Sequence, residues 1–110
     1  MAKYMVLFNY THETWSKMIA NPSDRLAAVR SSAQAVGGDV EAMYFMFGAK
    51  DGFVIIDAPD SASAAAVSIA VSSTGAVRDC ETHELIAPAE LPSVLERAST
   101  AQASYRPPGS

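Results

Sequence analysis

The sequence predicts a small α+β domain built on one antiparallel sheet, and three observations point to this class. The length of 110 residues suits one domain rather than two. Short apolar runs of strand length alternate with helix-length stretches that carry capping residues. The hydrophobic fraction of 49% is more than one small core requires, although alanine supplies 20 of those residues. The larger apolar side chains must therefore lie on strands buried on both faces, or form an exposed patch.

The first apolar run, residues 3–10, predicts a strand covered on both faces, because both of its alternating sets of side chains are apolar. Thr11 is the expected N-cap of a helix that follows at once. Asn21 and Pro22 interrupt this helix and are expected to cap a second one. Apolar residues then recur at helical spacing until the glycine pair 37–38 ends the pattern.

Residues 39–47 predict a second strand, and residues 53–58 a third strand that is apolar throughout. The segment 48–52 between them is expected to be a hairpin connection. Its Asp51–Gly52 pair tolerates the left-handed conformations that tight turns need.

A helix is expected over residues 61–74, with Asp60 as its N-cap and Gly75 at its end. Its valines and isoleucine alternate as in a strand, but the caps and the run of alanines favour a helix. Residues 76–86 predict the fourth strand. A short helix over residues 91–98, with a proline near its start, completes the pattern.

The order strand–helix–strand–strand–helix–strand describes a ferredoxin-like domain over residues 1–98, with a flexible tail over 99–110. In this topology the first and third strands are central, which agrees with their doubly apolar character. The two helices cover only one face of the sheet. We therefore expect a second copy of the chain to cover the other face, which makes the protein a homodimer or a higher homo-oligomer.

Composition argues against several functional classes. No apolar run approaches the ~20 residues that a membrane-spanning helix needs, and the N-terminal stretch is a poor signal peptide. The single cysteine, Cys80, excludes an internal disulfide and favours a reducing cytoplasm. The net charge is −4 and the eight basic residues are scattered, so we expect neither a nucleic acid nor a membrane as partner.

His12 is the candidate general acid or base, because it follows the first strand and lies close to aromatic side chains that could line a cleft. Its expected neighbours in that cleft are Asn9, Tyr10 and Trp15. The alternative is an exposed histidine at the start of a helix, with Trp15 packed into the core.

Two carboxylates have both a functional and a structural interpretation. Asp51 could act in a site, but an Asp-Gly pair is also what a turn prefers. Asp57 ends an otherwise apolar strand, so it either emerges at the sheet end or is paired, with Arg78 as the candidate partner. Cys80 is a poor nucleophile, because its acidic neighbours raise a thiol pKa.

Asp79, Glu81 and His83 stand two residues apart along the fourth strand, so their side chains share one face. This spacing could hold a divalent metal. We favour the alternative, an edge strand protected by charges, because a ligand set normally needs partners from elsewhere in the fold. No nucleotide, flavin or haem motif is present, so no cofactor is expected, although His12 or His83 alone could serve as an axial haem ligand.

Four segments resemble the GYD domain family over about residues 2–98, namely Lys3–Thr11, Gly48-x-x-Asp51, Asp57-Ala58-Pro59-Asp60 and Gly75-x-Val77-Arg78-x-x-x-Thr82. The resemblance implies a small bacterial protein with a ferredoxin-like fold of the dimeric α/β-barrel type. It implies no particular reaction, since similar barrels include cofactor-free monooxygenases, haem-handling proteins, isomerases and stress proteins. Lys50 stands where the family signature has tyrosine. A chemical role of that tyrosine would be lost here, whereas the stem of lysine could replace it in packing.

Two functional hypotheses follow. In the first, a small apolar or aromatic molecule binds between sheet and helices or at the dimer centre, and any reaction is cofactor-free proton transfer or oxidation with His12 as base. The expected apolar lining is Tyr4, Phe8, Tyr10, Trp15, Met43, Phe45, Phe47 and Phe53, and the expected polar groups are Asn9, His12, Asp51, Asp57 and Arg78. In the second, the same aromatic side chains serve only oligomerisation and leave no cavity.

Overall fold

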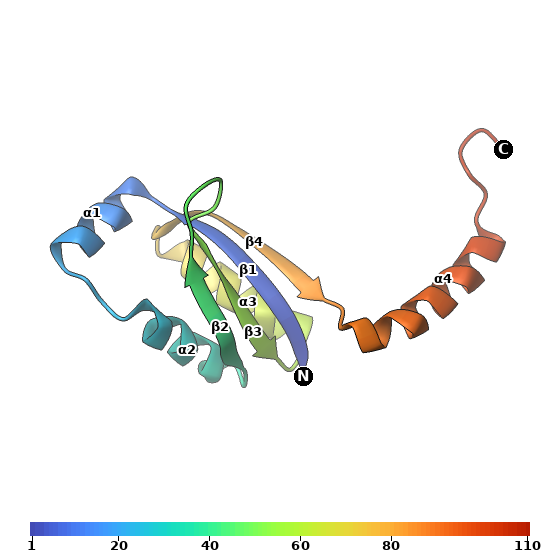
Figure 1. The fold of residues 1–110 in the computed structure, drawn as a ribbon, viewed down its shortest axis with the longest axis horizontal. Helices are drawn as coiled ribbons and strands as arrows, with labels where there is room; N and C mark the ends of the chain where they lie inside the picture. Colours follow the sequence, from blue (N-terminus) through green and yellow to red (C-terminus); the bar gives the residue numbers. More distant parts are fainter.

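The computed structural model describes residues 1–110 and contains one four-stranded sheet with helices on one face (Figure 1). The elements in chain order are β1 (Ala2–Tyr10), α1 (His12–Ala20), α2 (Arg25–Ala35), β2 (Asp39–Phe45), β3 (Gly52–Ala58), α3 (Ser61–Ser73), β4 (Val77–Leu85), a 3-10 turn (Pro88–Glu90) and α4 (Leu91–Ser104). The strand order is β2-β3-β1-β4, and all neighbours are antiparallel. This is the ferredoxin-like α+β arrangement that the sequence predicts, with β1 and β3 at the centre.

The core lies between the sheet and helices α2 and α3. It is formed by alternate residues of the central strands, such as Tyr4, Val6 and Ile56, which are almost fully buried. The residues between them, Met5 and Ile55 among others, face the opposite side and are only partly covered. The prediction that β1 and β3 are the central strands is therefore confirmed, whereas the expected cover on both faces is not provided within the chain, which covers only one face of the sheet.

Two of the three helix N-caps that the sequence predicts are present in the structure. Thr11 and Asp60 cap α1 and α3 as expected, and each side chain accepts a backbone N–H three residues ahead. The expected role of Asn21 is wrong. Asn21 instead ends α1, since its backbone N–H donates to the Lys17 carbonyl, and Asp24 is the N-cap of α2.

The β2–β3 connection differs from the prediction, because β2 ends at Phe45 and the Asp51–Gly52 pair is not its turn. The backbone with positive φ is at Gly48, at +138°. Gly52 is the first residue of β3, where a Cβ atom would stand 2.7 Å from the Phe8 ring and from the Tyr44 carbonyl oxygen. Glycine is therefore required there by close packing rather than by turn geometry.

Helix α4 projects away from the rest of the molecule (Figure 1). It continues to Ser104, so the helix expected over residues 91–98 is longer than predicted. Its main contacts are with the preceding 3-10 turn, and Leu91, Val94 and Leu95 stay exposed on it. The radius of gyration is 17.6 Å, against about 13 Å for a compact domain of this length. The flexibility expected beyond residue 98 stays a prediction.

Candidate functional site

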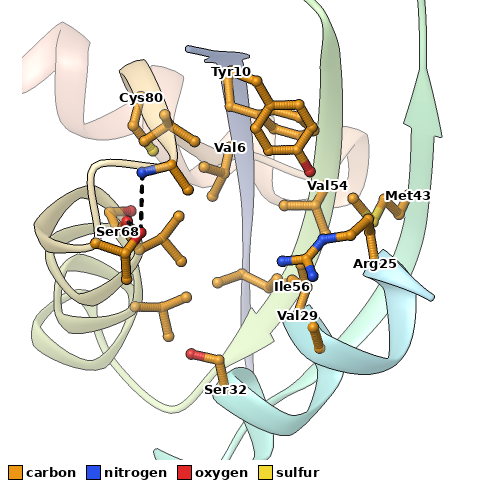
Figure 2. A pocket seen from close by; sticks show the side chains of 17 residues that line it. Val6, Tyr10, Arg25, Val29, Ser32, Met43, Val54, Ile56, Ser68 and Cys80 are labelled. Carbon is orange, nitrogen blue, oxygen red and sulfur yellow. Dashed lines mark hydrogen bonds between the residues drawn. The ribbon is translucent and has the colours of Figure 1, made fainter. Parts of the chain in front are cut away.

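A cavity of about 140 Å³ lies between the sheet and helices α2 and α3 (Figure 2). Its floor is made by the helix-facing side chains of the central strands, Val6, Val54 and Ile56. Valines from the two helices, Val29 on α2 and Val67 on α3, form its walls. Most of its lining residues are hydrophobic, so the interior favours an apolar occupant.

The cavity exists because the helices carry small side chains above the sheet. Ala33 and Ala64 are almost fully buried and let α2 and α3 pack close to the strands. Ala28, Ser32 and Ser68 line the space between the helices and are too short to fill it. The local sequence, rich in alanine and serine, therefore forms the helices well but leaves a void between them.

Two polar groups at this cavity make few interactions within the chain. The Arg25 guanidinium forms no ion pair, and its one side-chain hydrogen bond goes to Ser23 Oγ at 3.4 Å. Tyr10 is 8% exposed and its hydroxyl has no hydrogen-bond partner. Figure 2 shows the Arg25 side chain extending from α2 toward Tyr10 and Val54. The Cys80 thiol also lines the cavity, and burial raises its pKa, so it is neutral at physiological pH.

Only some of the aromatic and apolar side chains that the sequence suggested as a lining are found at the cavity. Phe8, Tyr10 and Met43 line the cavity. Tyr4 lies outside it, and its hydroxyl donates to Glu84 Oε1 at 2.9 Å and lies 3.2 Å from Ser61 Oγ. Phe53 faces the uncovered side of the sheet, whereas Phe45 and Phe47 are exposed around the hairpin and Trp15 packs edge-on against Tyr10.

Asn9 and Asp51 are brought together where β1 ends. The Asp51 carboxylate accepts hydrogen bonds from the Tyr10 backbone N–H at 2.9 Å and from the Trp15 indole N–H at 3.1 Å. The Asp51 backbone N–H donates to Asn9 Oδ1 at 2.9 Å. These bonds tie the β2–β3 hairpin to both β1 and α1, so this carboxylate has a clear structural task.

The same network continues to Lys50 and the first residues of β4. Asn9 Nδ2 donates to the Ala49 carbonyl and to Asp79 Oδ1, each at 3.1 Å. Lys50 Nζ donates to the same Asp79 oxygen at 3.2 Å. The hydrogen bond from Asn9, with help from Lys50, lowers the pKa of Asp79. Lys50 therefore joins the β2–β3 hairpin to β4 through an ion pair.

His12 lies on the surface, outside the lining of the cavity. Its side chain is 91% exposed, and its one ionic neighbour is Glu13, whose Oε1 is 3.5 Å from His12 Nε2. It does line an open depression with Tyr10, Trp15, Asp51 and Arg78, of which Tyr10 and Trp15 were expected beside it.

The expected pairing of Asp57 with Arg78 is wrong. Asp57 accepts a hydrogen bond from Lys3 Nζ at 2.8 Å, because the antiparallel register of β1 and β3 places these two residues opposite each other. Arg78 is the second residue of β4 and lies at the other end of the sheet, where its Nε is 3.6 Å from Asp79 Oδ2.

The polar side chains of β4 do not converge on a point. His83 Nε2 is 2.9 Å from Glu81 Oε2, and this contact lowers the pKa of Glu81, whereas Asp79 is directed to Asn9 and Lys50. No group of three or more histidine, cysteine, aspartate or glutamate side chains is placed to hold a metal ion.

Sequence reasoning missed the residues that shape the cavity mouth, Arg25 above all. A signal for Arg25 was present, since it follows directly on a capping aspartate at the start of a helix that faces the sheet. No local pattern, however, indicates that α2 packs over β2 and β3.

Comparisons with known proteins give a family match and a shared fold. The sequence model of the family described as the GYD domain matches residues 4–95. No curated protein matches the chain. Similar solved structures include TTHA0845 from Thermus thermophilus, with 17% identity and a TM-score of 0.51 over 79% of this chain and 95% of that chain. The hypothetical protein PHS023 from Pyrococcus horikoshii has 12% identity and a TM-score of 0.50, over 82% of this chain and 95% of that chain. MtbAldR has 16% identity and a TM-score of 0.56, over 78% of this chain and 52% of that chain.

These identities are low, so the structural likeness concerns the fold alone. No helix in the chain has the length and apolar character needed to span a membrane.

Proposed function

The chain belongs to the GYD domain family, and from this fold and its cavity we propose that the protein is a homodimer that binds a small apolar or aromatic molecule between the sheet and helices α2 and α3. The observation that carries the proposal is the cavity of about 140 Å³, which the chain's own side chains leave unfilled. An apolar cavity of about 150 Å³ is large enough to bind benzene, so the expected occupant is of single-ring size.

The apolar walls and floor of the cavity support a ligand, because a molecule that covers them removes apolar surface from water. A molecule that binds the folded chain and not the unfolded chain then raises the stability of the fold by mass action.

Binding, rather than catalysis with His12 as base, is the activity that we assign to the cavity. His12 lies outside the lining, and Asp51 uses its carboxylate to hold Tyr10 and Trp15. A reaction of the acid/base or oxidative type with His12 would have to involve the more open surface depression that His12 lines, which shares only Tyr10 with the cavity.

The test is binding of toluene and benzyl alcohol, followed by thermal unfolding and by chemical-shift changes of the methyl groups of Val29 and Val67. We expect saturable binding and a raised Tm. The variant Ser32→Leu places a larger side chain in the cavity, so it should abolish binding and leave the fold intact. Ser31→Leu, on the exposed side of the same helix, is the matched control and should bind as the wild type does. Loss of binding in both variants, or in neither, would contradict the proposed site.

The self-association in this proposal rests on the uncovered face of the sheet. Met5, Leu7 and Ile55 form an apolar strip along the two central strands, and Tyr44 extends it onto β2. A second copy related by a two-fold axis would bury the strip against itself. The exposed apolar residues of α4 give this chain a further surface that association could cover.

A second candidate function, an assembly protein with no ligand, is favoured by the same exposed surfaces. Native mass spectrometry of freshly purified protein distinguishes the two, since it reports the assembly mass and any retained small molecule together. A dimer that retains nothing and takes up neither toluene nor benzyl alcohol would favour the assembly protein.

A further inference from the structure

The cavity carries a cation at its mouth, and this feature adds a chemical class to the proposed ligand. We propose that the occupant is a small carboxylic acid whose apolar body fills the cavity and whose carboxylate pairs with Arg25. This inference rests on the proposed binding function and makes it more specific.

Arg25 is available for such a pair. A guanidinium offers five N–H donors in a planar fork that matches the two oxygens of a carboxylate. Of these donors only one is engaged, by Ser23 Oγ at 3.4 Å, although the chain has 12 acidic residues. The neighbouring Asp24 forms no ion pair with it, and Asp24 Oδ1 accepts the Ala27 N–H as the cap of α2.

The surroundings of Arg25 increase the strength of an ion pair. Its half-buried side chain lies among apolar residues of the cavity, including Val29, Met43 and Val54 (Figure 2). A charge near apolar walls is less well solvated than in water, and its attraction to an opposite charge is screened less. The attraction between Arg25 and an anionic ligand group at this position is therefore screened less than it would be at an open surface.

Tyr10 supplies a second, independent indication. Its side chain is more than nine-tenths buried and lines the cavity, yet its hydroxyl has no partner within the chain. Every fully enclosed side-chain polar atom of the chain has a partner, so this hydroxyl is reachable from outside. Because it is reachable and engages no group of the chain, this hydroxyl is free to donate to a ligand oxygen in place of water. In Figure 2 this hydroxyl is directed toward the Arg25 side chain, so one ligand carboxylate could take a bond from each.

The outer end of the cavity is polar, which suits the head of such a ligand. Arg25, Thr74 and Ala76 line both the cavity and a neighbouring groove on the surface. The charged residues of that groove besides Arg25 are Glu13 and Lys17. The arrangement is apolar inside and polar at the rim, with space for one ring or a short branched chain, as in benzoate or 3-methylbutanoate.

The experiment compares benzoate with the neutral analogue benzyl alcohol and the cationic analogue benzylamine, by calorimetry at pH 7. We expect benzoate to bind at least about 10-fold more tightly than benzyl alcohol, and benzylamine to bind most weakly. Arg25→Gln should lose about 10-fold or more in benzoate affinity and leave benzyl alcohol binding unchanged. Tyr10→Phe should lose several-fold for benzoate.

Arg30→Gln is the matched control, because Arg30 lies on the same helix, changes the net charge equally, and pairs with Asp39 outside the cavity. It should bind benzoate as the wild type does. Benzoate affinity that is equal in wild type and Arg25→Gln would overturn the inference while the binding function stands, provided that benzyl alcohol still binds. Failure of all three probes would overturn both.

Discussion

Removal of the Asp51 carboxylate should loosen the end of the sheet where the hairpin, β1 and α1 meet. In Asp51→Ala the Tyr10 backbone N–H and the Trp15 indole N–H each lose their acceptor. A donor left unsatisfied away from water costs about 1–3 kcal/mol, so the two together cost about 2–6 kcal/mol. For a domain of this size that corresponds to a fall in Tm of roughly 10 °C or more.

The assay uses Trp15, which is the only tryptophan of the chain and therefore reports on this site alone. Urea unfolding followed by Trp15 fluorescence gives the free energy, and the indole N–H resonance in an NMR spectrum reports the lost bond. Asp51→Asn keeps an acceptor in place and should cost less than Asp51→Ala. Glu13→Ala removes an exposed carboxylate from α1 and should change the free energy of unfolding by less than about 0.5 kcal/mol.

The reasoning would be refuted if the free energy of unfolding of Asp51→Ala lay within about 0.5 kcal/mol of the wild-type value. It would also be refuted if the Trp15 indole resonance did not move. Either result would mean that water replaces the carboxylate at no cost, and that Asp51 is free for another role.

Other predictions concern assembly, packing, capping and thiol chemistry. In light scattering the wild type should have twice the chain mass of 11.6 kDa. Tyr44→Glu, on the uncovered face of the sheet, should have the mass of one chain. The control Ile69→Glu, exposed on α3, should keep the wild-type mass. Gly52→Ala should lower the free energy of unfolding in urea by about 2 kcal/mol or more, because the new Cβ atom would lie 2.7 Å from neighbouring atoms. An unchanged free energy would show that this packing adjusts freely. Asp60→Ala should lower Tm at pH 7. The Ser63 backbone N–H holds the folded-state pKa of Asp60 below its ordinary 3.8, so its stabilisation is present above pH 3.8 and is lost as pH falls through the folded-state value, where the two Tm values should converge. Cys80 should react with iodoacetamide at pH 8 at least about 10-fold more slowly in the folded protein than in urea, because burial raises its pKa; equal rates would contradict that burial.

Much of the fold could be predicted because its signals are local. Thr11 and Asp60 begin helices by accepting nearby backbone N–H groups, and this depends only on residues within one turn. The doubly apolar runs identify β1 and β3 as central, since only a strand covered twice gains from apolar side chains on both faces. Asn21 misled because asparagine also ends helices, and the better cap, Asp24, lies three residues further on.

The candidate site could be predicted only in part, because register and packing decide it. Asn9, Tyr10, Trp15 and Asp51 were expected near one another and do lie together at the end of β1. Asp57 was assigned the wrong partner, since the register that sets it opposite Lys3 is a property of the strand pair rather than of either strand.

By itself, the sequence determined the order of the elements, the central strands and the excess of apolar surface, because periodicity and capping depend on residues that are close together in the chain. The tertiary structure alone decided that small side chains on α2 and α3 leave a cavity, that Arg25 stands at its mouth, and that His12 does not. The physical reason is that a cavity is the volume left over when helices dock on a sheet, and that volume depends on residues far apart in the chain.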